Sequence, residues 1–211
     1  MPVTEKDVYN IALSCLGTRS RVTATNDGSK EANALNIVYA DVRDELLQEY
    51  VWWFAKIRKP LATQAVAVAP DEWSYVYARP EDCLKVRFIC SPGVPPDRYD
   101  GLPPIPYEVR VVEDDTTPTP VKRKAILCDL DEAIVCYTYR VTDPDFMTAN
   151  FRLTLGWKLA AAVALNLTGS RDVARAAQDL YIGQFEKAKV IDAQEGISRR
   201  DQQVAPWTAA R

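Results

Sequence analysis

Apolar side chains recur at helical spacing in four segments, two in each terminal part of the chain. Thr4, Ser29 and Ser170 stand directly before three of these segments, where a hydroxyl side chain can accept a hydrogen bond from the first helical turn. The pattern therefore predicts four helices, over residues 5–16, 30–50, 146–167 and 171–195.

The middle of the chain alternates apolar and polar residues with a period of two, which predicts β-strands. Twelve of the 14 prolines lie between Pro60 and Pro144, and helix interiors exclude proline. Because no helical crossover separates the strands, antiparallel pairing is expected. The predicted strands cover residues 73–78, 84–90, 107–111, 124–128 and 135–139, and one face of the second should carry Leu84, Val86, Phe88 and Cys90.

These elements predict an α+β fold in which an antiparallel β region is inserted into a helical part that resembles a four-helix bundle. The helical part comprises residues 1–54 and 145–196, and the β region, with a long proline-rich loop, comprises residues 55–144. Residues 197–211 are polar and lack apolar periodicity, so they are expected to form an extended C-terminal arm.

Composition removes several kinds of chemistry. The chain has no histidine, which excludes Ser-His-Asp and Cys-His catalysis and histidine-ligated zinc. Its five cysteines are widely spaced and lack a C-x-x-C pair, so reduced, buried thiols are expected. Glycine-rich nucleotide loops are also absent. We therefore expect no catalytic residues, no cofactor and no metal site.

The chain is expected to be a soluble intracellular protein. No signal peptide is recognisable at the start, and the longest apolar run, residues 153–167, contains Lys158 and is too short to cross a bilayer. The 26 basic and 29 acidic residues give a net charge of −3, which disfavours a protein that coats nucleic acid.

Charged clusters are short and mostly border predicted turns. Acidic clusters occur at residues 113–115, 129–132 and 143–145, where solvated turns are more typical than paired catalytic carboxylates. Basic runs occur at residues 56–59, at residues 122–124 and at Arg199-Arg200. Each run is short, so phosphate binding is the less favoured interpretation of these residues.

Three other features are candidates for interaction surfaces. Residues 52–54, Trp-Trp-Phe, form either a docking surface or, more typically, packing between the helices and the sheet. Trp207 lies in the polar arm, where it suits insertion into a pocket of another chain. Asp41, Glu45 and Glu49 form an acidic stripe of like charges at i, i+4 spacing, which is destabilising unless something uses it.

Ordered short motifs over nearly the whole chain resemble the tail tubular protein A family, the head-to-tail adaptor (gatekeeper) proteins of short-tailed bacteriophages. Each motif alone is mostly a cap or a turn, and their order and spacing carry the resemblance. They are Asp27-Gly28-Ser29-Lys30-Glu31-Ala32, Val42-Arg43-Asp44-Glu45-Leu46-Leu47, Trp52-Trp53-Phe54-Ala55, Pro80-Glu81-Asp82-Cys83-Leu84, Tyr139-Arg140-Val141-Thr142-Asp143-Pro144, Leu167-Thr168-Gly169-Ser170-Arg171, Glu195-Gly196, Pro206-Trp207 and Arg211.

The resemblance implies a structural virion protein, located in the tail at the portal junction and made in the host cytoplasm. Such proteins form a ring, usually dodecameric, between the portal and the tail nozzle (a tail tubular protein B-like protein), and line the channel through which DNA passes. The implied portal or neighbour-subunit contacts are Pro206, Trp207, Arg211, Arg199 and Arg200. Tyr99, Leu102 and Ile105 are candidates for contact with the tail side or a ring neighbour.

Alternatives remain open from the sequence. The acidic stripe Asp41, Glu45 and Glu49 faces either the DNA channel, where like charge would keep DNA from sticking, or solvent. The protein could instead be a tail-completion protein of another type, a small DNA-binding module, or an enzyme that uses carboxylates. A DNA-binding module predicts salt-dependent affinity, and an enzyme predicts a polar pocket with perturbed acids.

Overall fold

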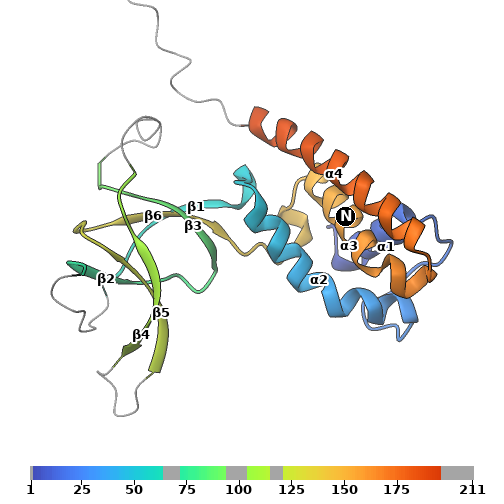
Figure 1. Cartoon of the computed structure of the whole chain (residues 1–211), viewed down its shortest axis with the longest axis horizontal. Coiled ribbons are helices and arrows are strands. Elements are labelled where there is room, and N and C mark those ends of the chain that lie inside the picture. The colour runs from blue at the N-terminus through green and yellow to red at the C-terminus, as the bar shows by residue number, and fades with distance from the viewer. Residues whose placement is uncertain (1, 64–71, 94–103, 115–120, 196–211) are drawn as a thin grey trace, which may run out of the picture. The chain divides into compact units, whose positions relative to one another are not determined.

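The computed structural model describes residues 2–63, 72–93, 104–114 and 121–195. Within these residues the protein has four α-helices and two three-stranded antiparallel sheets (Figure 1). The chain divides into a helical unit, Met1–Ala55 with Arg140–Gly196, and a β unit, Lys56–Tyr139. The predicted α+β fold class is therefore confirmed, while the predicted arm, residues 197–211, lies outside the described residues.

The helices begin where local capping chemistry directs them. Ser29 accepts a 3.1 Å hydrogen bond from the Ala32 amide, and Ser170 accepts one from the Val173 amide. The third helix begins later than predicted, because Pro144–Phe146 forms a 3-10 turn and Thr148 provides the cap. The helices are α1 (Glu5–Cys15), α2 (Lys30–Glu49), α3 (Ala149–Thr168) and α4 (Arg171–Gln194).

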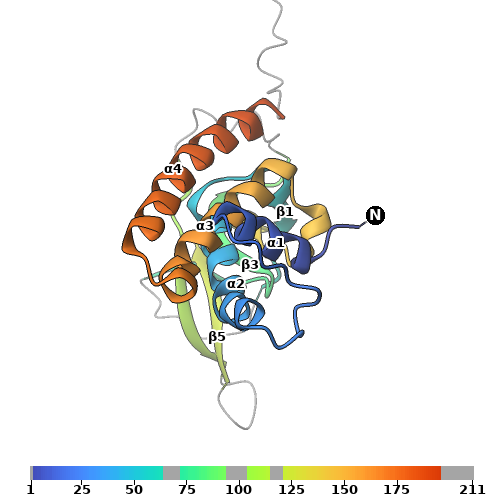
Figure 2. The same cartoon turned by 90° about the vertical axis from the view of Figure 1, so that its right-hand side faces the viewer.

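Helix α3 is the centre of the helical unit and packs against α1, α2 and α4 (Figure 2). Its apolar character explains this position, because a helix without a polar face is stable only when its neighbours cover it. Trp52, which follows α2, is 1% exposed, and its ring contacts those of Phe151 and Phe185. Trp53 is 44% exposed, so the two adjacent tryptophans have different environments.

Gly156 allows α1 to approach α3 closely. An added Cβ atom at Gly156 would lie 2.4 Å from Cγ2 of Ile11 on α1, whereas one at Gly183 on α4 would have no neighbour within 4 Å. Replacing Gly156 by alanine is expected to lower the free energy of unfolding by about 1–3 kcal/mol through overpacking. Gly183→Ala is expected to raise it by roughly 0.5–1 kcal/mol. Urea denaturation measures both, and changes of the same sign would contradict this interpretation.

The β unit contains two antiparallel sheets. In one, β6 lies between β1 and β3, and in the other, β5 lies between β2 and β4. Thr63, beyond the end of β1, bridges to Tyr77 of β2, and residues of both sheets form one hydrophobic core that includes Ile126 and Val135. The strands are β1 (Lys56–Pro60), β2 (Tyr75–Ala78), β3 (Cys83–Cys90), β4 (Glu108–Asp114), β5 (Val121–Cys128) and β6 (Ile134–Tyr139).

Two features of the sheet around β6 differ from the sequence prediction. Strand β1 was not predicted, because Ile57 is its only large apolar residue. The prediction that β3 presents alternate residues to one face is wrong, because the register shifts twice along β3. As a result Val86 and Ile89, three positions apart, enter the core, while Phe88 lies opposite Cys136 on the other face.

Candidate functional site

The acidic stripe lies on α2, and two of its three members are bound within the helical unit. Lys158 of α3 donates a hydrogen bond to Glu49 and lies 3.2 Å from a carboxylate oxygen of Glu45. The hydroxyl of Tyr181, on α4, donates a 2.5 Å hydrogen bond to the second oxygen of Glu49. Asp41 is exposed. A channel-facing role for the stripe stays a prediction, now with Glu45 and Glu49 already paired.

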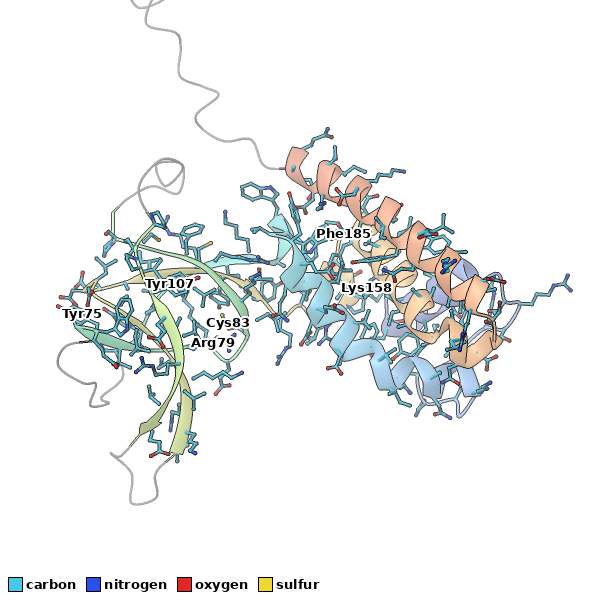
Figure 3. The ribbon with its side chains drawn as sticks, in the orientation of Figure 1. Tyr75, Arg79, Cys83, Tyr107, Lys158 and Phe185 are labelled. Atoms are coloured by element: carbon cyan, nitrogen blue, oxygen red, sulfur yellow. The ribbon has the colours of Figure 1, made fainter. Side chains whose placement is uncertain are left out.

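Lys158 connects three helices from an interior position (Figure 3). Its side chain is 11% exposed, and its ammonium group lies 5.4 Å from the centre of the Tyr181 ring. Burial and the hydrogen bond to Glu49 hold the pKa of Tyr181 well above its usual range, so the hydroxyl is a donor at neutral pH. The cluster therefore joins α2, α3 and α4 and offers no general base.

The other predicted interaction residues fall mostly outside the described part of the chain. Ile105 is described, and its half-buried side chain packs against the hydrophobic core of the β unit. The candidates outside the described residues are Tyr99, Leu102, Arg199, Arg200, Pro206, Trp207 and Arg211. Their proposed contacts with the portal, the nozzle or a neighbouring subunit stay predictions.

Carboxylates in the predicted acidic clusters stabilise turns and chain ends. Asp129 accepts hydrogen bonds from the amide and hydroxyl of Ser74, and Asp143 accepts one from the Asp145 amide at the 3-10 turn. Asp145 in turn accepts a hydrogen bond from the Val3 amide. These contacts confirm the turn interpretation for these three residues.

The cysteines are inert where the structure describes them. Burial raises the pKa of Cys15 to about 11 and also raises the pKa values of Cys83, Cys128 and Cys136, so these thiols stay protonated at neutral pH. Among the described residues, no three cysteine or carboxylate side chains are grouped to hold a metal ion. The described helices also include none with the length and apolar character needed to cross a membrane.

The sequence analysis missed a concentration of positive charge on the sheet formed by β1, β6 and β3. Lys56 and Arg58 of β1 lie across β6 from Lys85 and Arg87 of β3, on the face opposite the core. We call these four residues the basic face. In the sequence, Lys56 and Arg58 belong to a short basic run, and Lys85 and Arg87 are the polar positions of a strand. Only strand pairing brings the two pairs together.

Asp192, in the last turn of α4, is a buried carboxylate that binds the chain after α2. It is 3% exposed, and its two oxygens accept hydrogen bonds of 3.3 and 3.1 Å from the Trp53 amide. Burial raises the pKa of Asp192 to about 6, and Glu195 adds to the rise, while the Trp53 hydrogen bond opposes it. The buried negative charge therefore lowers stability at neutral pH.

Asp192→Asn is expected to flatten the dependence of stability on pH. Because the pKa of Asp192 is higher in the folded than in the unfolded protein, its stabilising contribution is full below about pH 4 and is lost as pH rises through 6. The wild type should lose about 1–2 kcal/mol of unfolding free energy from this group between pH 5 and pH 8. Urea denaturation at both pH values measures the loss, with exposed Asp179→Asn as control; an equal loss in Asp192→Asn would contradict the assignment.

The described residues thus contain one charge cluster that joins helices, one buried carboxylate near the start of the β unit, and one basic sheet face. None of the three combines a nucleophile with a base, and each has a structural or binding explanation. A comparison with models of known protein families finds no match to this chain, and a comparison with curated proteins finds none either.

Proposed function

We propose that the protein is a head-to-tail adaptor, a structural virion protein that forms a ring between the portal and the tail nozzle of a short-tailed bacteriophage. The proposal begins from the resemblance of the ordered motifs to the tail tubular protein A family. Two of these motifs meet in space: Arg140, from the motif after β6, donates a 2.8 Å hydrogen bond to Asp44, from the motif in α2. Asp44 also pairs with the buried Arg43.

The observation that carries the assembly role is a second apolar stripe on α4. One side of α4 is buried through Ala177, Tyr181 and Ala188. The exposed side repeats at i, i+4, i+7 and i+14 with Ala176, Leu180, Gly183 and Val190, of which Leu180 and Val190 are 53% and 60% exposed. A monomer gains nothing from an exposed apolar stripe, whereas a ring subunit buries it against a neighbour.

The test is native mass spectrometry of the purified protein, alone and mixed with its cognate portal ring. A full set of subunits loaded on each portal is the expected result, and its mass gives the ring number. A protein that stays monomeric with the portal present would overturn the proposal. A tail-completion protein of another type would bind without dependence on the portal.

Variants of the α4 stripe sharpen this test. The double variant Leu180→Asp with Val190→Asp should keep the circular dichroism spectrum, since both side chains are exposed. It should lose at least tenfold in portal loading, because each new carboxylate would be buried at the subunit contact. Ile37→Asp, on the exposed side of α2, makes the same chemical change at a side chain that is 78% exposed. Equal loss in both variants would remove the α4 stripe from the interface.

A further inference from the structure

Positive side chains form two cross-strand rows on the sheet of β1, β6 and β3. In the first row, Lys56 and Lys85 flank Thr138 of β6. In the second, Arg58 and Phe88 flank Cys136, and Arg87 lies at the adjoining register shift. Strand spacing puts the two rows about 7 Å apart and the outer strands about 10 Å apart. The basic face is therefore a compact grid of four cations.

The surroundings of Cys136 show that these charges converge. Burial raises the pKa of the Cys136 thiol, while Lys56, Arg58 and Arg87 each oppose that rise. Three cations thus act on one side chain in the middle of the sheet. Described carboxylates of the β unit make their contacts elsewhere: Glu72 and Glu108 bind Arg110, Glu113 pairs with Lys122, and Asp82 accepts a hydrogen bond from Tyr137.

The sheet holds part of the basic face in fixed positions. The Arg87 side chain donates a 2.8 Å hydrogen bond from Nε to the Thr138 hydroxyl. The Lys56 ammonium lies 5.7 Å from the centre of the Phe88 ring. Arg58 and Lys85 are exposed to solvent. Cations that are ordered before binding lose less conformational entropy when an anion arrives.

The chemistry of the face favours a nucleic-acid backbone over a protein partner. Protein interfaces are depleted of lysine at their centres and use aromatic or aliphatic anchors, whereas DNA interfaces are polar and strongly positive. The apolar groups in the middle of this face, Cys136 and Phe88, are buried and half-buried and cannot serve as anchors. Phe88 also lies under Lys56, so it provides no stacking platform for an unpaired base.

We propose that the basic face, Lys56, Arg58, Lys85 and Arg87, binds the phosphate backbone of duplex DNA without sequence preference. The choice of phosphate follows from the face itself, and the choice of DNA rests on the proposed adaptor function, in which DNA passes the ring. Because the chain as a whole is negative, a single subunit binds weakly, and a ring multiplies the contact. Such contacts would hold the passing duplex without a fixed register.

The test measures fluorescence anisotropy of a labelled 30-bp duplex titrated with the full chain over a series of salt concentrations. Four phosphate contacts predict a slope of log affinity against log salt of about −3 to −4. Arg58→Gln with Lys85→Gln, at two exposed positions, should weaken binding roughly tenfold or more and reduce the slope to about −2. The matched control, Lys122→Gln with Lys124→Gln on exposed β5 positions, changes net charge equally and should alter affinity less than twofold.

Three results would overturn the inference. They are no binding at low salt, equal loss of affinity in the basic-face and control variants, and binding of polyglutamate as tight as that of the duplex at the same salt. Thermal unfolding of both double variants should match the wild type, since the four substituted side chains are exposed. Portal loading of the same proteins separates the proposals. Loading without DNA binding removes only the basic face, and DNA binding without loading removes only the adaptor function.

Discussion

Replacement of Trp52 by alanine is expected to lower the free energy of unfolding of the helical unit by about 3–5 kcal/mol. Trp52 is among the largest fully buried side chains, at 1% exposure. Its ring lies edge-on to those of Tyr50 and Phe151, at 5.1 and 5.0 Å between centres. Its Nε1 donates a 2.9 Å hydrogen bond to the Leu46 carbonyl. Truncation would leave a cavity and an unpaired carbonyl at the end of α2.

The adjacent tryptophan provides the control for Trp52. Trp53→Ala removes the same side chain one position further on, where it is 44% exposed, and leaves the backbone hydrogen bond to Asp192 in place. Its expected cost is below about 1 kcal/mol. Urea denaturation followed by far-ultraviolet circular dichroism measures both variants. Similar losses would show that Trp52 does not organise the core of the helical unit as described.

Lys158→Met is expected to cost about 2–3 kcal/mol of unfolding free energy at neutral pH. Methionine keeps most of the apolar stem of Lys158 but removes the charge that pairs with Glu49 and Glu45. Breaking a fully buried ion pair costs about 3–5 kcal/mol, and the expected value is lower because the partner carboxylates remain in partial contact with water. The remaining charge of Glu49 would depend on Tyr181 alone for a partner within the cluster.

A double-mutant cycle separates the ion pair from packing. Glu49→Gln in the Lys158→Met background should cost less than Glu49→Gln in the wild type, because the variant lacks the cation that the carboxylate serves. Glu45→Gln is the control: its side chain is 63% exposed, and its expected cost is at most about 0.5 kcal/mol. Additive effects of Lys158→Met and Glu49→Gln would mean that the pair is not coupled.

Helix starts and most strands were predictable from the sequence because their signals are local. Ser29 and Ser170 cap helices two residues or more before any tertiary contact is needed, and the chain turns at Gly169, whose φ of +69° suits glycine. Strand β1 escaped prediction because a short edge strand with charges around Ile57 lacks a strong apolar pattern. The third helix was predicted too long because a proline-led 3-10 turn continues its apolar pattern.

The candidate sites were less predictable, because each depends on residues far apart in the chain. The sequence shows Glu45 and Glu49 as a like-charge stripe, and nothing near them indicates that Lys158 will neutralise it. Likewise, Asp192 reads as one more polar residue near the end of a helix, until its contact with the Trp53 amide and its burial are seen.

The sequence by itself determined the order of elements, the helix caps, the α+β class and the absence of histidine chemistry, since each depends on residue types and short-range spacing. The tertiary structure alone decided which charges meet. Pairing of β1 and β3 with β6 turns Lys56, Arg58, Lys85 and Arg87 into one face, and the register shifts in β3 settle which of its residues enter the core. Electrostatic energy depends on distance in space, and a one-residue shift in a strand reverses the face that a side chain occupies.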